Sequence, residues 1–235
     1  MASERIHALI PAAGRSVRFG GSTLKQYAHL LGAPVIAHSI EAVSRHASVV
    51  AVTVALAPDD GIFDDLVRPG WPDVRTVTGG DSRAESVLNG LRHIVREDPE
   101  AEWVLVHDAA RPCLPAGLVQ RLVDAALASG TGAILAVPVH DTLKLADDEG
   151  RIERTVDRSR YWAAQTPQMF RIRQLAEQLD AALSAGESPT DEAAAMERAG
   201  VRPLLVPGSP HNIKITGSED LVLAEFILQR LTYSD

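Results

Sequence analysis

The stretch IHALIPAAGRSVRFGGSTLK, residues 6–25, sets the fold of this chain. It opens with a short apolar run, Ile6–Ile10, of the kind that forms a buried β-strand. Small residues, two arginines, a Gly-Gly pair and Lys25 follow. Small side chains let backbone N–H groups approach an anion closely, and Arg and Lys neutralise its charge. The strand, the loop and the cations together indicate a loop that binds a triphosphate.

This loop matches neither of the two common phosphate-binding patterns. Five residues separate Gly14 from Gly20 and no lysine follows Gly20 directly, so the P-loop pattern is absent. Ser16 stands where the dinucleotide-binding pattern needs its second glycine. For the loop taken alone, an ordinary strand-to-helix turn with surface cations is the alternative.

Strand-like and helix-like runs alternate along most of the chain. The short apolar runs are Ile6–Ile10, Val49–Leu56, Val74–Val77, Trp103–Val106 and Ala133–Val137. Helical periodicity marks the segments that begin at Pro34, Val87 and Leu118, and later Leu175–Leu183 and Asp220–Leu231. Ser82 and Glu85 form a capping box for the helix that contains Val87. This alternation predicts an α/β fold, a mainly parallel Rossmann-like sheet with helices on both faces.

Three polar segments follow strand ends in this scheme. They are Pro11–Lys25, Gly79–Arg83 and His107–Pro112. Ligands of such sheets bind beyond the carboxyl ends of the strands, so we expect these segments to meet in one crevice. Asp108, at one of these ends, is a candidate Mg²⁺ ligand, although a turn or cap residue is the alternative. Successive side chains in an extended segment point to opposite sides, so we expect the neighbouring His107 to point away from Asp108. Arg111 could pair with Asp108 or reach a phosphate.

Residues 138–160 differ from the rest of the chain. Two short strand-like runs flank Ala146-Asp-Asp-Glu-Gly150, a pattern typical of a charged β-hairpin. The segment has too few apolar residues to bury much of itself. We therefore expect a protruding β-hairpin arm, either a solvated flap or an arm that packs on a second subunit.

Composition excludes several classes of protein. The 235 residues suit one α/β domain, and 46% of them are hydrophobic, which is ample for a core. A net charge of −8 argues against binding to nucleic acid or to an anionic membrane surface. The single cysteine, Cys113, excludes an intrachain disulfide framework and fits a reducing compartment. With no apolar run long enough for a signal peptide or a membrane span, we expect a cytoplasmic protein.

A series of blocks occurs in order from the first loop to the last sixth of the chain. They are Pro11-Ala-Ala-Gly14 with Arg18, Lys25-Gln-Tyr27, Gly79-Gly-Asp-Ser-Arg83 with Ser86-Val87, His107-Asp-Ala-Ala-Arg-Pro112, Asp141-Thr142 with Lys144, Asp157-Arg158, Gln165-Thr-Pro-Gln168, Thr190-Asp191-Glu192 and Asn212-Ile-Lys-Ile-Thr216. This pattern resembles the 2-C-methyl-D-erythritol 4-phosphate cytidylyltransferase family of the non-mevalonate isoprenoid route. Two departures stand in the first loop, where Ser16 replaces a usual Gly and Leu24 a usual Pro.

The resemblance implies a single nucleotidyltransferase domain over residues 1–235 that joins CTP to methylerythritol phosphate and releases pyrophosphate. It implies Arg18 and Lys25 as the catalytic cations and Asp108 as the ligand of Mg²⁺ or another divalent cation. It implies CTP contacts from Pro11, Ala12, Ala13, Gly14, Gly80, Asp81 and Ser86. Without a ligand, Asp81 and Ser82 could serve only to cap a helix.

The resemblance also implies a second set of residues around the phosphate of the acceptor. These are Thr142, Arg158, Thr166, Thr190 and Lys214, some of them supplied by a partner subunit. The arm, residues 138–160, would then lie at the interface of a homodimer. Asp191 and Glu192 are expected in the first turn of a helix, where the dipole favours acids.

Two other functions compete with this one. A ribitol-5-phosphate cytidylyltransferase would share the nucleotide half and differ in the contacts to the polyol. A non-catalytic nucleotide-binding module would not need Asp108, Lys25 and the acceptor residues together.

Overall fold

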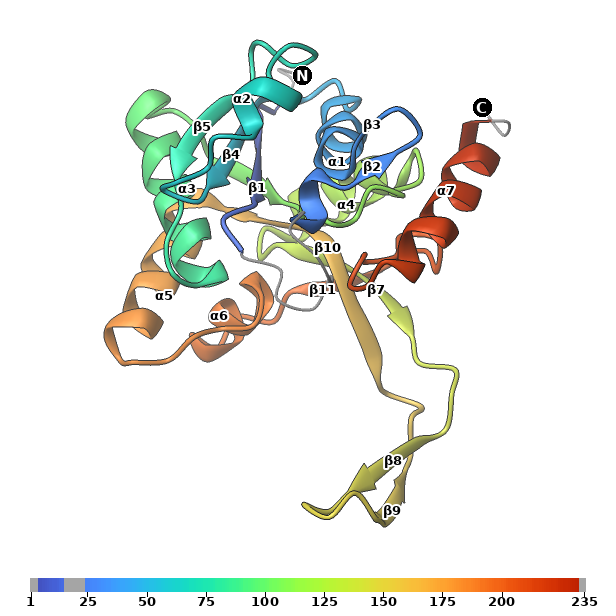
Figure 1. Ribbon diagram of the computed structural model, residues 1–235. Helices are drawn as coiled ribbons and strands as arrows, with labels where there is room; N and C mark the ends of the chain where they lie inside the picture. Colours follow the sequence, from blue (N-terminus) through green and yellow to red (C-terminus); the bar gives the residue numbers. More distant parts are fainter. Residues whose placement is uncertain (1–3, 15–23, 233–235) are drawn as a thin grey trace.

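The computed structural model describes residues 4–14 and 24–232 (Figure 1). A seven-stranded sheet lies at its centre, in the order β11-β7-β10-β6-β1-β4-β5. The strands are β1 (Ile6–Pro11), β4 (Val49–Leu56), β5 (Arg75–Thr78), β6 (Trp103–Val106), β7 (Ala133–Pro138), β10 (Trp162–Arg171) and β11 (Leu204–Pro207). All adjacent pairs are parallel except the two that include β10. The predicted α/β fold with a mainly parallel sheet is confirmed.

Helices cover both faces of the sheet, as predicted. One face packs on α1 (Val35–Ser44) and α4 (Leu118–Ser129), with the short α2 (Phe63–Leu66) beside them. The other face packs on α3 (Arg83–Glu97), α5 (Ile172–Ser184) and α6 (Glu192–Arg198). Neighbouring residues of β1 divide between the two sides, since Ala8 joins the first cluster and Leu9 the second. A strand buried on both faces is made mostly of apolar residues, as Ile6–Ile10 is. Its one polar residue, His7, is buried with its Nε2 3.0 Å from the Asp98 carboxylate.

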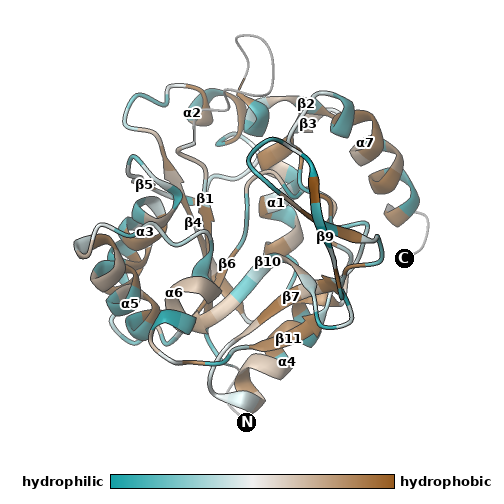
Figure 2. Cartoon of the chain, turned by 90° about the horizontal axis from the view of Figure 1, so that it is seen from below, coloured by the Kyte–Doolittle hydropathy of each residue, from teal (hydrophilic) through white to brown (hydrophobic). Residues whose placement is uncertain are grey.

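Two strands of the sheet, β10 and β11, were not predicted. β10 contains Pro167, and a proline in a central strand normally argues against the assignment. The pairing of β10 with β7 is irregular between Ala164 and Gln168, so Pro167 falls where regular pairing is interrupted. Figure 2 shows a hydrophilic stretch within β10. β11 is a four-residue strand on the edge of the sheet, and of its residues only Val206 is buried.

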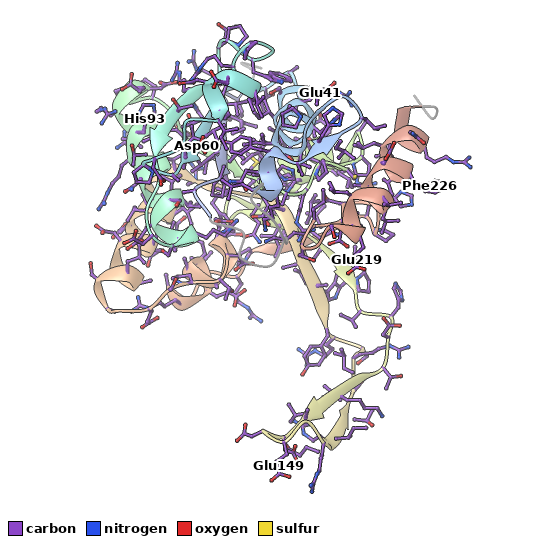
Figure 3. The ribbon with its side chains drawn as sticks, in the orientation of Figure 1. Glu41, Asp60, His93, Glu149, Glu219 and Phe226 are labelled. Atoms are coloured by element: carbon purple, nitrogen blue, oxygen red, sulfur yellow. The ribbon has the colours of Figure 1, made fainter. Side chains whose placement is uncertain are left out.

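The predicted hairpin projects from the body of the molecule as an arm (Figure 1). It consists of β8 (Leu143–Ala146) and β9 (Ile152–Val156), which pair antiparallel. The Asp147 carboxylate accepts hydrogen bonds from the backbone N–H groups of Glu149 and Arg151 and so closes the turn. Glu149 lies at the far tip of the arm (Figure 3).

The remaining elements flank the sheet. The 3₁₀ helix η1 (Lys25–Tyr27) leads into a small hairpin of β2 (His29–Leu30) and β3 (Ala33–Pro34). The last helix, α7 (Glu219–Thr232), packs through Ala224 and Ile227 on a separate cluster around Cys113. Among the helices of the described residues, none is both long and apolar enough to cross a bilayer.

Candidate active site

A pocket opens at the carboxyl ends of β1, β5 and β6. The described parts of the three segments expected to meet there do so, and they are joined by Lys214 from the segment that precedes α7. The pocket is lined by Pro11, Ala12, Ala13, Gly14, Lys25, Gln26, Gly80, Asp81, Ser82, Arg83, Ser86, Asp108, Ala109, Ala110 and Lys214. It therefore gathers all the residues predicted to contact CTP, together with Lys25 and Asp108.

Close packing fixes the loop between β5 and α3. A Cβ at Gly79 would lie 2.6 Å from the Cβ of Ala13 and 2.8 Å from Oγ of Ser86, so only glycine allows this approach. Ser86 Oγ accepts a hydrogen bond from the backbone N–H of Gly80 (3.0 Å). The Ser82–Glu85 capping box is present and starts α3 immediately after this loop. The loop is thus held on two sides before any ligand binds.

Two neighbours of Lys25 anchor it at the pocket. The side-chain amide of Gln26 donates to the carbonyl oxygen of Ala12 (3.0 Å), which ties η1 to the first loop. The hydroxyl of Tyr27 donates to Asp60 (2.7 Å). Burial, and then this hydrogen bond to a carboxylate, raise the pKa of Tyr27, so the phenol stays protonated. With both neighbours fixed, the Lys25 side chain is left to line the pocket.

Three cations surround the carboxylate of Asp108, which is only 7% exposed. Arg83 Nε lies 3.0 Å from Oδ1, Lys214 Nζ lies 2.7 Å from Oδ2, and Arg111 Nε lies 3.7 Å from Oδ2. Burial alone would raise the pKa of Asp108, but Arg83 and then Lys214 outweigh it and hold that pKa well below its usual range. Asp108 is therefore ionised near neutral pH.

His107, the residue before Asp108, helps to fix the Asp108 backbone through Thr166. His107 is fully buried, and its Nε2 lies 3.0 Å from the carbonyl oxygen of Arg111. Its Nδ1 lies 3.1 Å from the hydroxyl of Thr166, and that hydroxyl accepts the backbone N–H of Asp108 (2.9 Å). His107 thus points away from the Asp108 side chain, as alternation predicted. Thr166, predicted at the acceptor phosphate, lies behind Asp108 in this chain.

Hydrogen bonds around Asn212 fix the position of Lys214. The side-chain amide of Asn212 donates to the backbone carbonyl oxygen of Thr166 (2.8 Å). The backbone carbonyl oxygen of Asn212 accepts from Arg111 Nη1 (2.7 Å). The backbone N–H of Ile215 donates to the carbonyl of Ala110 (2.8 Å). The Asn212–Thr216 block therefore serves to hold one ammonium group at the pocket.

Some predicted site residues are not gathered at this pocket. Thr142 and Arg158 lie on the arm, which leads away from the body, and Thr190 is exposed just before α6. Arg18, predicted as catalytic, and Ser16 fall outside the described residues. Asp191 and Glu192 stand where they were expected, since Asp191 caps α6 and Glu192 begins it.

Sequence reasoning missed two charged residues of the site, Arg83 and Glu192. Arg83 lines the pocket, and Glu192 is buried and binds Arg83 Nη1 at 2.6 Å. Both stand inside blocks that carry the family resemblance, which is the signal that could have singled them out. Their pairing joins segments 109 residues apart, and no local pattern predicts it.

The described residues contain no group of three or more His, Cys, Asp or Glu side chains that could hold a metal ion. Asp108 lines the pocket, with Arg83 hydrogen-bonded to Oδ1 and Lys214 2.7 Å from Oδ2. An ionised carboxylate offers about four lone-pair sites, so these two contacts do not use all of them. Mg²⁺ is commonly held by one or two carboxylates plus substrate phosphates. The donor set fits a cation that arrives with a nucleotide, and it does not form an all-protein cage.

The burial of His107 predicts a pH-dependent stability. Burial lowers the pKa of His107 from 6.5 to about 4, so the folded protein keeps this imidazole neutral. Below pH 6.5 the unfolded chain binds a proton that the folded chain refuses, and stability is lost as the pH falls toward 4. The loss from this group is on the order of 3 kcal/mol. Urea unfolding of wild type and His107→Gln in metal-free buffer, between pH 7 and 4, measures it.

In that experiment the His107→Gln variant should lose less stability than wild type over the same pH range, because glutamine does not titrate. The glutamine amide can still donate to the Arg111 carbonyl. Equal pH profiles for the two proteins would contradict a buried neutral imidazole.

Comparison with known proteins identifies the family. The family model for 2-C-methyl-D-erythritol 4-phosphate cytidylyltransferase matches residues 6–230. A protein of that name from Tolumonas auensis is 48% identical over 95% of this chain and 96% of its own length. One from Vibrio parahaemolyticus is 47% identical over 95% of both chains. A crystal structure of 4-diphosphocytidyl-2C-methyl-D-erythritol synthase superposes with a TM-score of 0.83 at 40% identity, covering 96% of this chain and 99% of the other. The chain belongs to the 2-C-methyl-D-erythritol 4-phosphate cytidylyltransferase family.

Proposed function

We propose that this chain joins CTP and 2-C-methyl-D-erythritol 4-phosphate to give 4-diphosphocytidyl-2-C-methyl-D-erythritol and pyrophosphate. The observation that carries the proposal is the pocket itself. Lys25, Arg83 and Lys214 line it together with Asp81 and Asp108. With Arg111 and Glu192 directly behind them, four positive charges face three negative ones in a chain whose net charge is −8. Such a pocket attracts anions to one place on an otherwise acidic protein.

In the reaction, a phosphate oxygen of the acceptor attacks the α-phosphorus of CTP. The new P–O bond forms as the bond from the α-phosphorus to the bridging oxygen breaks, and pyrophosphate leaves with that electron pair. The attacking phosphate is already ionised near neutral pH, so no general base is needed. What the protein supplies is the alignment of two anions and the neutralisation of their charge.

Lys25 and Arg18 are assigned to the charge that grows on the leaving group. Lys25 lies at the pocket on a segment that Gln26 and Tyr27 anchor. Arg18 belongs to the same loop in sequence and is assigned through the family motif. A guanidinium can grip two phosphate oxygens at once, whereas an ammonium acts as a point charge, so the two cations complement each other.

Base selection is assigned to the loops that line the apolar part of the pocket. Pro11, Ala12, Ala13, Gly14, Gly80 and Asp81 would surround the nucleotide, mostly through backbone groups. Ser86 would act by holding the Gly80 backbone, to which it is hydrogen-bonded. A loop fixed before binding loses little conformational entropy when the base arrives.

Asp108 is assigned to a divalent cation, Mg²⁺ in the first instance, that enters with the triphosphate. When bound, the cation neutralises triphosphate charge. Arg83, Lys214 and Arg111 keep Asp108 ionised, and the hydrogen bond from its backbone N–H to Thr166 fixes where it points. Lys214 also belongs to the proposed acceptor set, which would place the acceptor phosphate beside the metal. Thr166, of the same set, would act through its hydrogen bond to the backbone of Asp108.

We assign the rest of the acceptor site to two chains. Thr142 and Arg158 would reach the pocket of a partner subunit, where Thr190 stands at the start of α6. The arm exposes the large apolar side chains of Leu145 and Ile152, and Tyr161 and Trp162 are exposed at its base. An isolated two-stranded hairpin is marginal in water, so an arm of this kind needs a surface to pack on. A homodimer in which each arm packs on its neighbour meets that need.

The domain and its location complete the proposal. Residues 1–235 are assigned to one nucleotidyltransferase domain, and residues 138–160 to its arm. The reaction is assigned to the cytoplasm. Cys113 is a free thiol whose pKa burial raises to about 12, and unpaired cysteines are usual in reducing compartments.

Pyrophosphate release tests the function. With CTP and Mg²⁺ present, we expect release with methylerythritol phosphate and little with ribitol 5-phosphate, because the two differ in the contacts that the acceptor site must make. Release with neither acceptor, from protein that binds CTP, would instead indicate a nucleotide-binding module. Release with ribitol 5-phosphate alone would reverse the choice of acceptor.

The Lys25→Ala variant tests the charge assignment. Turnover should fall by about 10²-fold or more, the typical cost of removing one stabiliser of transition-state charge. Arg92→Ala is the matched control, since Arg92 lies on α3 with its side chain 56% exposed and pairs with Asp180. Steady-state pyrophosphate release measures both variants, and a folded Lys25→Ala enzyme with wild-type turnover would disprove the role.

The Ile152→Glu variant tests the arm. Ile152 is 66% exposed in the single chain, and a carboxylate there would be buried unpaired in the proposed dimer. We expect the dimer dissociation constant to rise by about 10-fold or more, with activity lost in parallel. Ile62→Glu makes the same change beside α2, where Ile62 is 38% exposed. Sedimentation velocity measures the dimer dissociation constant, and pyrophosphate release is assayed in parallel. A wild-type protein that is active as a monomer would disprove the role of the arm in a shared active site.

A further inference from the structure

One buried ion pair connects the nucleotide side of the pocket with the acceptor side. Arg83 begins α3, directly after the loop assigned to CTP, and Glu192 begins α6, two residues after Thr190. Nη1 and Nη2 of Arg83 lie 2.6 and 3.2 Å from the two carboxylate oxygens of Glu192, a bidentate arrangement. Glu192 is 1% exposed, so this pair is shielded from solvent on the carboxylate side.

The same guanidinium also binds Asp108. Its other edge, formed by Nε and Nη2, lies 3.0 Å from Oδ1 of Asp108. Arg83 therefore bridges two carboxylates, with one edge of its planar fork on each. A lysine could not do this, because an ammonium is a point charge without two fixed edges.

Helix α6 holds Glu192 rigidly at this place. Gln168, on β10, donates to the Asp191 carboxylate (2.9 Å) and accepts the backbone N–H of Ala193 (2.9 Å). Asp191 caps the helix by accepting the N–H of Ala194 (2.9 Å). The residues on either side of Glu192, Asp191 and Ala193, are both hydrogen-bonded to Gln168 on β10. The backbone of Glu192 is therefore held in place independently of Arg83.

Glu192 controls how much of Arg83 is available to Asp108. With Glu192 in place, only one edge of the guanidinium reaches Asp108, and only at Oδ1. Without that charge, the bidentate partner of Arg83 is gone, and the nearest remaining carboxylate is Asp108. The Nε–Nη2 edge, which now contacts Oδ1 alone, could then turn to bind Oδ1 and Oδ2 together. The added hydrogen bond to Oδ2 would occupy a lone pair that a cation needs.

We infer that Glu192 is a positioning residue that restrains Arg83 and so keeps the Asp108 carboxylate open toward the pocket. The inference rests on the proposed function, in which Asp108 meets a cation that arrives with CTP. Glu192 itself does not line the pocket, and its effect passes through Arg83.

Calorimetric titration of CTP tests this role without turnover, because no acceptor is present. The quantity of interest is the CTP dissociation constant measured without Mg²⁺ divided by the one measured with Mg²⁺. This ratio is large when Mg²⁺ strengthens CTP binding. Residues that orient metal ligands typically contribute 10- to 100-fold to metal affinity. The Glu192→Gln variant should lower the ratio by about 10-fold while CTP binding without Mg²⁺ changes little. Glu197→Gln, the same change on the exposed face of α6, should leave the ratio as in wild type.

The Arg83→Lys variant changes the other partner of the Arg83–Glu192 ion pair. Lysine keeps the positive charge but cannot bridge both carboxylates, so this variant should lower the ratio as well. It also keeps the inference testable if Glu192→Gln fails to fold, which thermal unfolding of each variant would reveal. A purely structural role for Glu192 would lower the melting temperature and leave the ratio unchanged in folded protein, and that result would overturn the inference.

Asp108→Asn separates the two proposals. If the ratio is large in wild type and falls to about one in Asp108→Asn, the metal assignment stands. In that case, a wild-type ratio in folded Glu192→Gln and Arg83→Lys refutes the positioning role alone. If Asp108→Asn leaves the ratio as in wild type, the metal assignment fails and the role of Glu192 fails with it.

Discussion

The carboxylate of Asp108, buried among Arg83, Lys214 and Arg111, is the interaction on which the site depends. A buried carboxylate is costly unless it is paired and hydrogen-bonded, and removing one partner of such a group is more costly still. Each of the three cations comes from a different segment, and each segment is fixed by bonds of its own. The start of α3, the loop after β6 and the segment before α7 must therefore come together around this one carboxylate to neutralise its charge.

Much of this arrangement could be predicted from the sequence. The apolar runs at Ile6–Ile10 and Trp103–Val106 indicated buried strands, and both are adjacent in the sheet. Because parallel strands present their carboxyl ends on one side, the loops after them had to meet, and the pocket lies there. The capping box at Ser82 and Glu85 was readable because it depends only on residues three apart.

The parts that were missed depend on distant partners. β10 is a central strand despite Pro167, since the pairing with β7 is interrupted there, and no local pattern reveals this. Glu192 looked like an ordinary acid in the first turn of a helix, where acids are common. Only the fold shows that it faces Arg83, 109 residues earlier in the chain. Arg18 lies outside the described residues, so its assignment rests on the family motif.

β10 also limits where evolution can change the length of this chain. The strand starts at Trp162, at the base of the arm, and ends at Arg171. Between them lie Gln165, Thr166 and Gln168, whose side chains support the site. Inserting or deleting one residue within it would turn every following side chain to the opposite face of the sheet. The turn around Asp147 is exposed and makes no such demand. Homologues should therefore differ in length at the tip of the arm, whereas its base should keep a constant number of residues.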